Sequence, residues 1–195
     1  MTSNDQTPTR LDFARAAALI AHHIRQDVAG VTKIIRTAEA DRRLSALLWA
    51  VADTAIAEDG NTIGTPEGIR ALGELALDMA THATDEAPGT DQRAHGRDIK
   101  RAAMFFRYRQ HNDSDGANSV LCEAEEAGRA TALIGAAAAL AYMAAGSTLA
   151  TPGGLAGLER VARTLNRPDT PGRGDDHDRC PTGHRCGAIA CMCSK

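Results

Sequence analysis

The chain has 195 residues and a formal net charge of −3, which excludes a general attraction to nucleic-acid phosphates. Aromatic residues are scarce, at one Trp, two Tyr and three Phe, and alanine, the strongest helix former, supplies much of the apolar content. The abundance of Arg and the scarcity of Lys are typical of a high-GC bacterial genome. Because the first ten residues are polar and lack the pattern of a signal peptide, we expect a cytoplasmic protein with reduced thiols.

Three helices are predicted in the first 60 residues. The first runs from about Leu11 to Gln26, where apolar residues recur at helical spacing. Asp27 suits the N-cap of a short second helix, which carries Ile34 and Ile35 on one face. Asp41 is expected to cap a third helix, whose apolar stripe is formed by Leu44, Leu47, Leu48, Val51 and Ala55.

A glycine-rich stretch separates the third predicted helix from a fourth. Gly60 is expected to end the third helix, because glycine readily adopts the left-handed conformation found there. Thr65 followed by Pro66 predicts a helix start, since the hydroxyl accepts from free amides and proline has a preset φ. The fourth helix is expected over about 66–81. No segment alternates like a strand for more than a few residues, so the predicted fold class is all-α.

The same pattern recurs further along the chain. A shift of 86 residues aligns Leu11–Ala80 with Arg97–Asn166 without a gap, and 21 of the 70 aligned positions are identical. We interpret this as a tandem duplication of a three- to four-helix unit. The predicted organisation is a disordered N-terminus (1–10), repeat 1 (11–83), an exposed linker (84–96), repeat 2 (97–167) and a Cys/His-rich tail without regular structure (168–195).

The two units share further features: an opening Asp-x-x-Arg-Ala-Ala helix, an Asp-x-x-Gly turn and a long Ala/Leu helix. In these features residues 11–166 resemble a small Ala/Arg-rich helical module of uncharacterised proteins from high-GC actinobacteria. The resemblance implies an all-helical fold. It brings no catalytic residues with it, and it does not extend to the tail.

The stretch from Ala130 to Leu158 contains no charged residue and is long enough to span a bilayer. It consists mostly of Ala and Gly, however, and Thr151-Pro152 interrupts it, so we expect no membrane span. A helix that is apolar on all sides is expected to be buried. The helix 130–145 is therefore predicted to pack within the chain or to contact a protein partner, such as a second copy in a homodimer.

The tail carries the most reactive side chains of the sequence. Four thiols and two imidazoles fall within 17 residues, and so short a segment cannot build an apolar core. Because zinc takes four such ligands and its binding can fold a segment, we expect a metal site, with zinc ahead of copper. The candidate ligands are His177, Cys180, His184, Cys186, Cys191 and Cys193.

Other functions of the tail stay open. The spacing of its cysteines matches no known zinc signature, and the tail could be a flexible terminus. Arg179 and Arg185 would lower the pKa of nearby thiols, which fits a redox role. A modified-peptide precursor with a folded helical leader is a further alternative.

The rest of the chain offers weaker candidates. Arg107, Arg109 and the neighbouring aromatic residues form one basic–aromatic stretch, which could bind nucleic acid but more often packs, and a nucleic-acid partner is therefore not expected. His22 and His23 fit a solvated or half-buried role, and Cys122 is expected to be a small buried side chain. No catalytic arrangement is recognisable. The sequence favours a helical binding or scaffolding protein, with a nucleic-acid-associated regulator as a further alternative.

Overall fold

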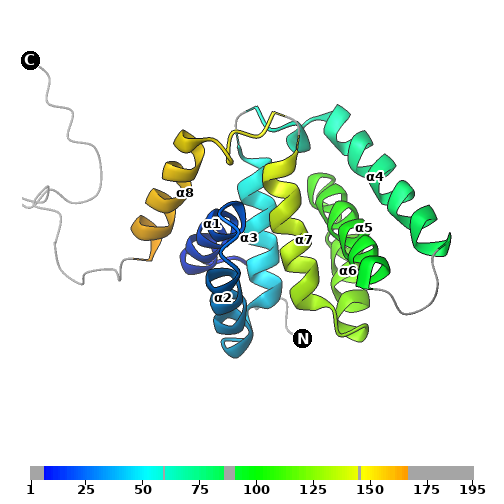
Figure 1. The fold of residues 1–195 in the computed structure, drawn as a ribbon, viewed down its shortest axis with the longest axis horizontal. Helices are drawn as coiled ribbons and strands as arrows, with labels where there is room; N and C mark the ends of the chain where they lie inside the picture. The colour runs from blue at the N-terminus through cyan, green and yellow to red at the C-terminus, as the bar shows by residue number, and fades with distance from the viewer. Residues whose placement is uncertain (1–6, 59, 86–90, 145, 167–195) are drawn as a thin grey trace, which may run out of the picture.

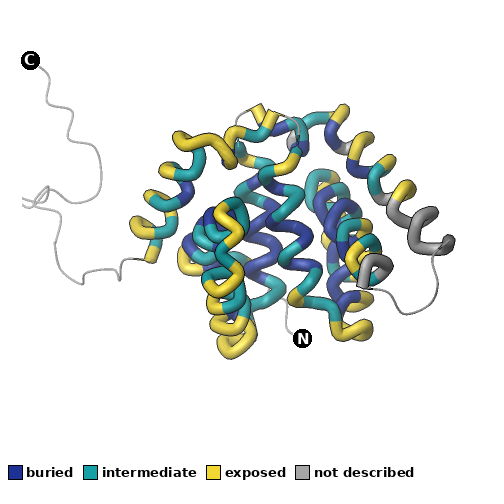
Figure 2. The backbone as a smooth tube through the Cα atoms, in the orientation of Figure 1, coloured by how far each residue is buried: buried dark blue, intermediate teal, exposed yellow. Residues whose placement is uncertain are grey.

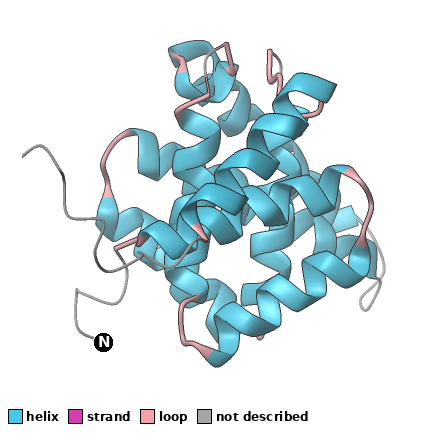
Figure 3. Cartoon of the chain, turned by 90° about the vertical axis from the view of Figure 1, so that its left-hand side faces the viewer, coloured by secondary structure: helices cyan, strands magenta, loops and turns pink. Residues whose placement is uncertain are grey.

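A computed structural model describes residues 7–58, 60–85, 91–144 and 146–166 of the chain. Within these ranges it contains eight α-helices, one short 3-10 turn and no strand, which confirms the all-α fold (Figure 3). The helices are α1 (Arg10–Ile24), α2 (Val28–Ala40), α3 (Leu44–Ile56), α4 (Pro66–Asp85), α5 (Asp91–Gln110), α6 (Ser114–Glu126), α7 (Ala130–Met143) and α8 (Pro152–Leu165), and the 3-10 turn η2 is Thr62–Gly64.

The helix starts follow from local capping chemistry. The Asp27 carboxylate accepts from the Gly30 amide at the start of α2, at 3.0 Å, as its predicted N-cap role requires. The Thr65 hydroxyl accepts from the Gly68 amide at 3.2 Å where α4 begins. In the second half, the Thr151 hydroxyl accepts from the Gly154 amide at 3.1 Å at the start of α8. These predicted helix starts are confirmed.

Two expectations about the ends of helices are wrong. Asp41 does not cap α3; the N-cap residue is Arg43, which forms no side-chain cap. Asp41 is instead the C-cap residue of α2, and its carboxylate forms an ion pair with Arg15 of α1. The linker predicted over residues 84–96 is also too long, because α4 continues to Asp85 and α5 begins at Asp91. Pro88 and Gly89 are the helix-breaking residues, and the sequence from there to the end of α5 contains no further proline.

Helices α3 and α7 lie side by side at the centre of the molecule (Figure 1). Helix α1 packs on α3 and α5 packs on α7, while α2 and α6 pack on the outer sides of α1 and α5. The fourth helix of each half packs against the first helix of the other half, so that α4 contacts α5 and α8 contacts α1. The buried residues concentrate along the facing sides of α3 and α7 (Figure 2).

The uncharged helix α7 is buried inside the chain. Leu133 and Ile134 are almost fully inaccessible, together with four of its alanines, whereas Met143 at its C-terminal end is 69% exposed. Among the described residues, no helix combines the length and the hydropathy that crossing a membrane requires. A protein partner or a homodimer stays a prediction, and α7 offers it little exposed surface.

Structural features also recur at the 86-residue spacing. Helices α2 and α6 begin and end at equivalent positions, and so do the starts of α3 and α7 and of α4 and α8. The left-handed backbone positions recur as well: Gln26 and Asn112, Arg42 and Gly128, Gly60 and Gly146. The duplication stays a prediction about ancestry, and these correspondences support it.

Candidate functional site

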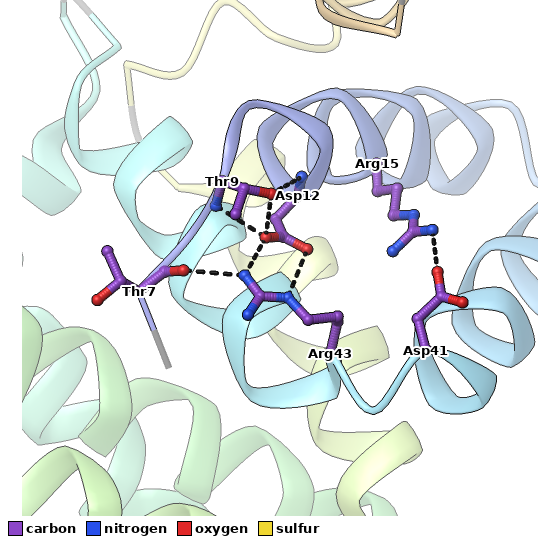
Figure 4. Close-up of polar contacts among 6 residues, drawn as sticks. All are labelled: Thr7, Thr9, Asp12, Arg15, Asp41 and Arg43. Carbon is purple, nitrogen blue, oxygen red and sulfur yellow. Dashed lines mark hydrogen bonds and ion pairs between the residues drawn. The ribbon is translucent and has the colours of Figure 1, made fainter. Parts of the chain in front are cut away.

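A buried aspartate–arginine pair occurs at the same place in each half. In the first half, Asp12 is 1% exposed and accepts from Arg43 of the turn before α3, at 2.5 Å (Figure 4). In the second half, Asp98 is also 1% exposed and forms an ion pair with Arg129. Because both halves contain this pair, it belongs to the fold and connects the first helix of each half to the third.

The first of these pairs is reinforced by a capping box. The Asp12 carboxylate also accepts from the backbone amide and the hydroxyl of Thr9, at 2.8 and 2.7 Å. Burial raises the pKa of Asp12, but the hydrogen bonds from Arg43 and Thr9 outweigh burial and hold the pKa below its usual value. Arg43 in addition donates to the Thr7 carbonyl oxygen at 2.9 Å, which fixes the segment that precedes α1.

The predicted metal ligands do not belong to the part of the chain that the structure describes. His177, Cys180, His184, Cys186, Cys191 and Cys193 all fall between residues 167 and 195. Among the described residues, no three His, Cys, Asp or Glu side chains gather as a metal site requires.

Cys122 is described, and the expectation that it is buried is wrong. It is exposed on α6, because Leu121 and Ala124 supply the face of α6 that packs inward.

The segment that Arg43 fixes forms one wall of a recess between the two halves. This Trp49 recess has a volume of about 370 Å³ and lies between α3 of the first half and α5 and α6 of the second half. Trp49 is the only tryptophan of the chain and is 8% exposed. The recess is lined by Thr7, Pro8, Trp49, Asp53, Arg109, Ser114, Asp115 and Asn118.

An ion pair lies at the centre of this region. The Nε of Arg109 on α5 donates to a carboxylate oxygen of Asp53 on α3, at 2.6 Å. The Arg109 guanidinium also lies over the Trp49 ring, with its Cζ 5.2 Å from the ring centroid. The indole also packs on Phe105 of α5, edge to face, with ring centroids 5.1 Å apart. Two residues of α5, in the second half of the chain, therefore hold the indole of α3 in place.

A second recess adjoins the first and shares the ion pair. This Gln110 recess has a volume of about 330 Å³ and is lined by Asp53, Ile56, Ala57, Arg109, Gln110 and Asn112. Asp53 and Arg109 line both recesses, so the ion pair stands between the two.

The two recesses concentrate unpartnered polar atoms. Five buried side-chain nitrogen or oxygen atoms have no hydrogen-bond partner among the described residues. Four of the five belong to residues that line these recesses: Trp49 Nε1, Asn118 Oδ1, Gln110 Nε2 and Gln110 Oε1. Since buried polar groups in folded proteins are nearly always hydrogen-bonded, these four atoms mark the two recesses as the place where the described residues leave the most hydrogen-bonding capacity unused.

These polar residues are present in one half only. At the positions 86 residues away, Trp49 corresponds to Gly135, Asp53 to Ala139, Gln110 to Ile24 and Asn118 to Thr32. The fold therefore tolerates small or apolar residues at these positions. Fold stability alone does not explain the tryptophan, the carboxylate and the two amides, and this distinguishes them from the buried Asp–Arg pairs that both halves contain.

In the basic–aromatic stretch of α5, the phenylalanine rings pack into the core and two of the arginines form ion pairs. Phe105 and Phe106 are fully buried, and neither ring is available to stack on a base. Arg101 is held by Asp98 and Glu123, and Arg109 by Asp53. The sequence interpretation missed the Trp49 recess because Arg109 was assigned to this stretch. The 86-residue comparison contains the signal that would have found it.

The histidine pair is half-buried, as expected. His22 Nδ1 lies 2.8 Å from a carboxylate oxygen of Asp27, and His23 Nδ1 lies 3.5 Å from the Tyr142 hydroxyl. Burial lowers the pKa of His23. His23 occupies the position equivalent to Arg109, and Tyr142 the position equivalent to Ile56. The equivalent positions of the two halves thus carry different chemistry.

No family model, no curated protein and no solved structure matches this chain.

Proposed function

We propose that the chain is a binding protein rather than an enzyme. In this proposal the helical body holds a polar ligand in the Trp49 and Gln110 recesses, and the C-terminal segment binds a metal ion, zinc in preference to copper. The observation that carries the first part is the group of four unpartnered polar atoms around the Asp53–Arg109 pair. The second part depends on the sequence alone.

The chemistry of the recesses supports binding over catalysis. Their described lining includes neither a histidine nor a cysteine, and the hydroxyls and the Asp115 carboxylate in it lie at the exposed rim. Asp53 and Arg109 form an ion pair with each other, so both side chains are engaged within the protein rather than with a substrate. What the recesses offer is hydrogen-bonding capacity, a fixed aromatic ring and partial shelter from water, which are the properties of a ligand site.

The metal proposal for the tail is supported by the crowding of soft ligands. Thiols and imidazoles bind zinc tetrahedrally, and the binding energy can order a segment that has no apolar core. The tail also contains Met192, and thioether and thiolate ligands together would favour Cu(I). Zinc is proposed first because thiolates combined with imidazoles are its usual structural ligands.

Metal analysis of the purified full-length protein tests the tail. We expect close to one equivalent of zinc in the wild type and its loss in the double variant Cys186→Ser/Cys191→Ser. Cys122→Ser is the matched control, because this exposed cysteine lies on α6, outside the tail. Less than a tenth of an equivalent of any metal in the wild type contradicts this part of the proposal.

Tryptophan fluorescence tests the recess. Because Trp49 is the only tryptophan, its emission reports on this site alone. We expect a set of small polar fragments, with anionic, cationic and neutral members, to include compounds that change the emission saturably. The double variant Gln110→Ile/Asn118→Thr, which installs the residues of the other half, should abolish the response. A wild type that responds to none of the fragments contradicts this part of the proposal.

A further inference from the structure

We infer that the ligand of the two recesses presents neutral amide groups to Trp49, Asn118 and Gln110. This inference rests on the proposed binding function and specifies the chemistry of the ligand.

The two charged side chains at the centre of the site already form an ion pair with each other. The Arg109 guanidinium is bound to Asp53 at 2.6 Å and stacks over the indole at 5.2 Å. An anionic ligand would have to compete with Asp53 for Arg109, and it would also meet the second carboxylate of the lining, Asp115. A cationic ligand would have to compete with Arg109 for Asp53. A ligand without net charge leaves the pair intact.

Two residues that line the Trp49 recess carry buried atoms without partners, one donor and one acceptor. The indole Nε1–H needs an acceptor, and the Asn118 Oδ1 needs a donor. A carboxylate can satisfy only the indole, and an ammonium group can satisfy only Asn118. An amide carries a carbonyl oxygen and an N–H together, so that one group can satisfy both atoms.

The Gln110 recess repeats this requirement on the other side of the ion pair. Both polar atoms of the Gln110 side chain, Nε2 and Oε1, are buried and unpartnered. A carboxamide of this kind pairs with another amide through two hydrogen bonds, one in each direction. A ligand that fills both recesses would therefore present one amide to the Trp49 recess and one to the Gln110 recess. A small carboxamide would satisfy one side, and a peptide main chain would satisfy both.

The test uses three probes of nearly equal size and different charge: benzamide, benzoate and benzylammonium. Each is titrated into the full-length protein and followed by the emission of Trp49. We expect benzamide to bind at least roughly tenfold more tightly than either charged probe, the factor that corresponds to one lost hydrogen bond or one unpaired charge. A fourth probe, acetyl-alanyl-alanine methylamide, distinguishes a peptide main chain from a small carboxamide, because it should bind more tightly than benzamide if the ligand spans both recesses.

Single variants separate the two recesses. Asn118→Thr should weaken benzamide roughly tenfold, because the carboxamide oxygen is replaced by a hydroxyl on a shorter side chain. Gln110→Ile should weaken the peptide probe by a similar factor and benzamide less. Thr32→Asn, at the equivalent position of the other half, is the matched control and should change neither affinity. Circular dichroism shows that each variant is folded before its affinity is measured.

The outcomes separate this inference from the function on which it rests. If benzoate or benzylammonium binds as tightly as benzamide, the amide inference is wrong while a binding function stands. If the affinity for benzamide is the same in wild type and in Asn118→Thr, the inference is wrong as well. If no probe or fragment perturbs Trp49, the recess holds only water, and both the inference and the binding function of the body are overturned.

Discussion

Gly60 and Gly146 meet backbone to backbone where the turns after α3 and α7 cross. Both have a positive φ, +85° and +77°. A Cβ atom on Gly146 would lie 2.2 Å from the carbonyl oxygen of Gly60, whereas a Cβ on Gly60 would lie 3.6 Å from the carbonyl oxygen of Gly146. The two positions share a backbone conformation and differ in the space that a side chain would find.

This difference predicts unequal effects of the same substitution. Gly60→Ala should cost about 1 kcal/mol, the strain of a left-handed alanine. Gly146→Ala should cost clearly more, about 3 kcal/mol or above, because the new methyl group overlaps a backbone oxygen that cannot move freely. Urea unfolding of the two variants measures both values. Equal losses of stability would show that the close approach of the turns is not rigid.

The same crossing is held by one carboxylate. Glu58 accepts from the hydroxyls of Ser147 and Thr148, at 2.9 and 2.7 Å, from the Thr148 amide, and from the Asn61 side chain at 3.0 Å. Glu58→Ala should therefore destabilise the fold by about 2 kcal/mol, since several charge-assisted bonds are lost together. Glu74→Ala is the control: Glu74 forms an exposed pair with Arg70 within α4, so its loss should cost less than about 0.5 kcal/mol. A control that is as unstable as Glu58→Ala would contradict this account.

The buried pair of Figure 4 predicts a pH dependence of stability. The pKa of Asp12 in the folded protein lies below the ordinary value of an aspartate, because the bonds from Arg43 and Thr9 outweigh the opposing effect of burial. Its stabilising contribution is therefore complete above the pKa of the unfolded chain and is lost as the pH falls through the folded pKa. At pH 7, Asp12→Asn should be less stable than wild type by about 2 kcal/mol, and the difference should narrow below about pH 4.

Unfolding free energies measured in urea between pH 7 and pH 3 check this prediction. The neighbouring pair Arg15–Asp41 supplies the control, because its carboxylate is 48% exposed. Asp41→Asn should change stability by less than about 1 kcal/mol at any pH in the range. A constant difference between Asp12→Asn and wild type across the whole range would mean that Asp12 does not act through its charge.

Much of the fold was predictable because its signals are local. Asp27 and the Thr65-Pro66 pair start helices through bonds to amides three residues away, and such bonds can be recognised in sequence. Asp41 was misassigned because its partner, Arg15, comes from another helix and is 26 positions distant. The position of α5 was predicted too late, since the boundary was placed at the end of the polar stretch instead of at Pro88-Gly89.

The candidate site was not predictable from motifs. Asp53 and Arg109 are 56 positions apart and meet only because α3 and α5 come together across the two halves. No spacing rule connects them. Comparison of the two aligned halves would have identified the site instead. At the 86-residue shift Trp49 aligns with Gly135 and Asp53 with Ala139, so the corresponding helix of the other half has neither an aromatic ring nor a charge at these positions. The tail lies outside the described residues, so its metal ligands stay a prediction.

The ion pair between Arg109 and Asp53 predicts that removing Asp53 changes the selectivity of the site for charged ligands. Asp53→Ala, which installs the residue of the other half, leaves the Arg109 guanidinium without its carboxylate. Benzoate should then bind roughly tenfold more tightly than it does to wild type, because it can pair with the released guanidinium. Ala139→Asp is the corresponding change in the other half and should leave benzoate binding unchanged. Titration followed by Trp49 emission measures both, and an unaltered benzoate affinity in Asp53→Ala would contradict the role given to the pair.

The ¹H–¹⁵N spectrum of the full-length protein tests the ligand site most directly. The chain has one indole N–H, that of Trp49, and therefore gives one indole cross-peak. In the free protein we expect this peak at the upfield position of an indole without a protein acceptor, and benzamide should move it downfield saturably as the ligand carbonyl accepts the bond. A peak that already lies at the hydrogen-bonded position, and that no amide moves, would contradict the assignment of this recess as a ligand site.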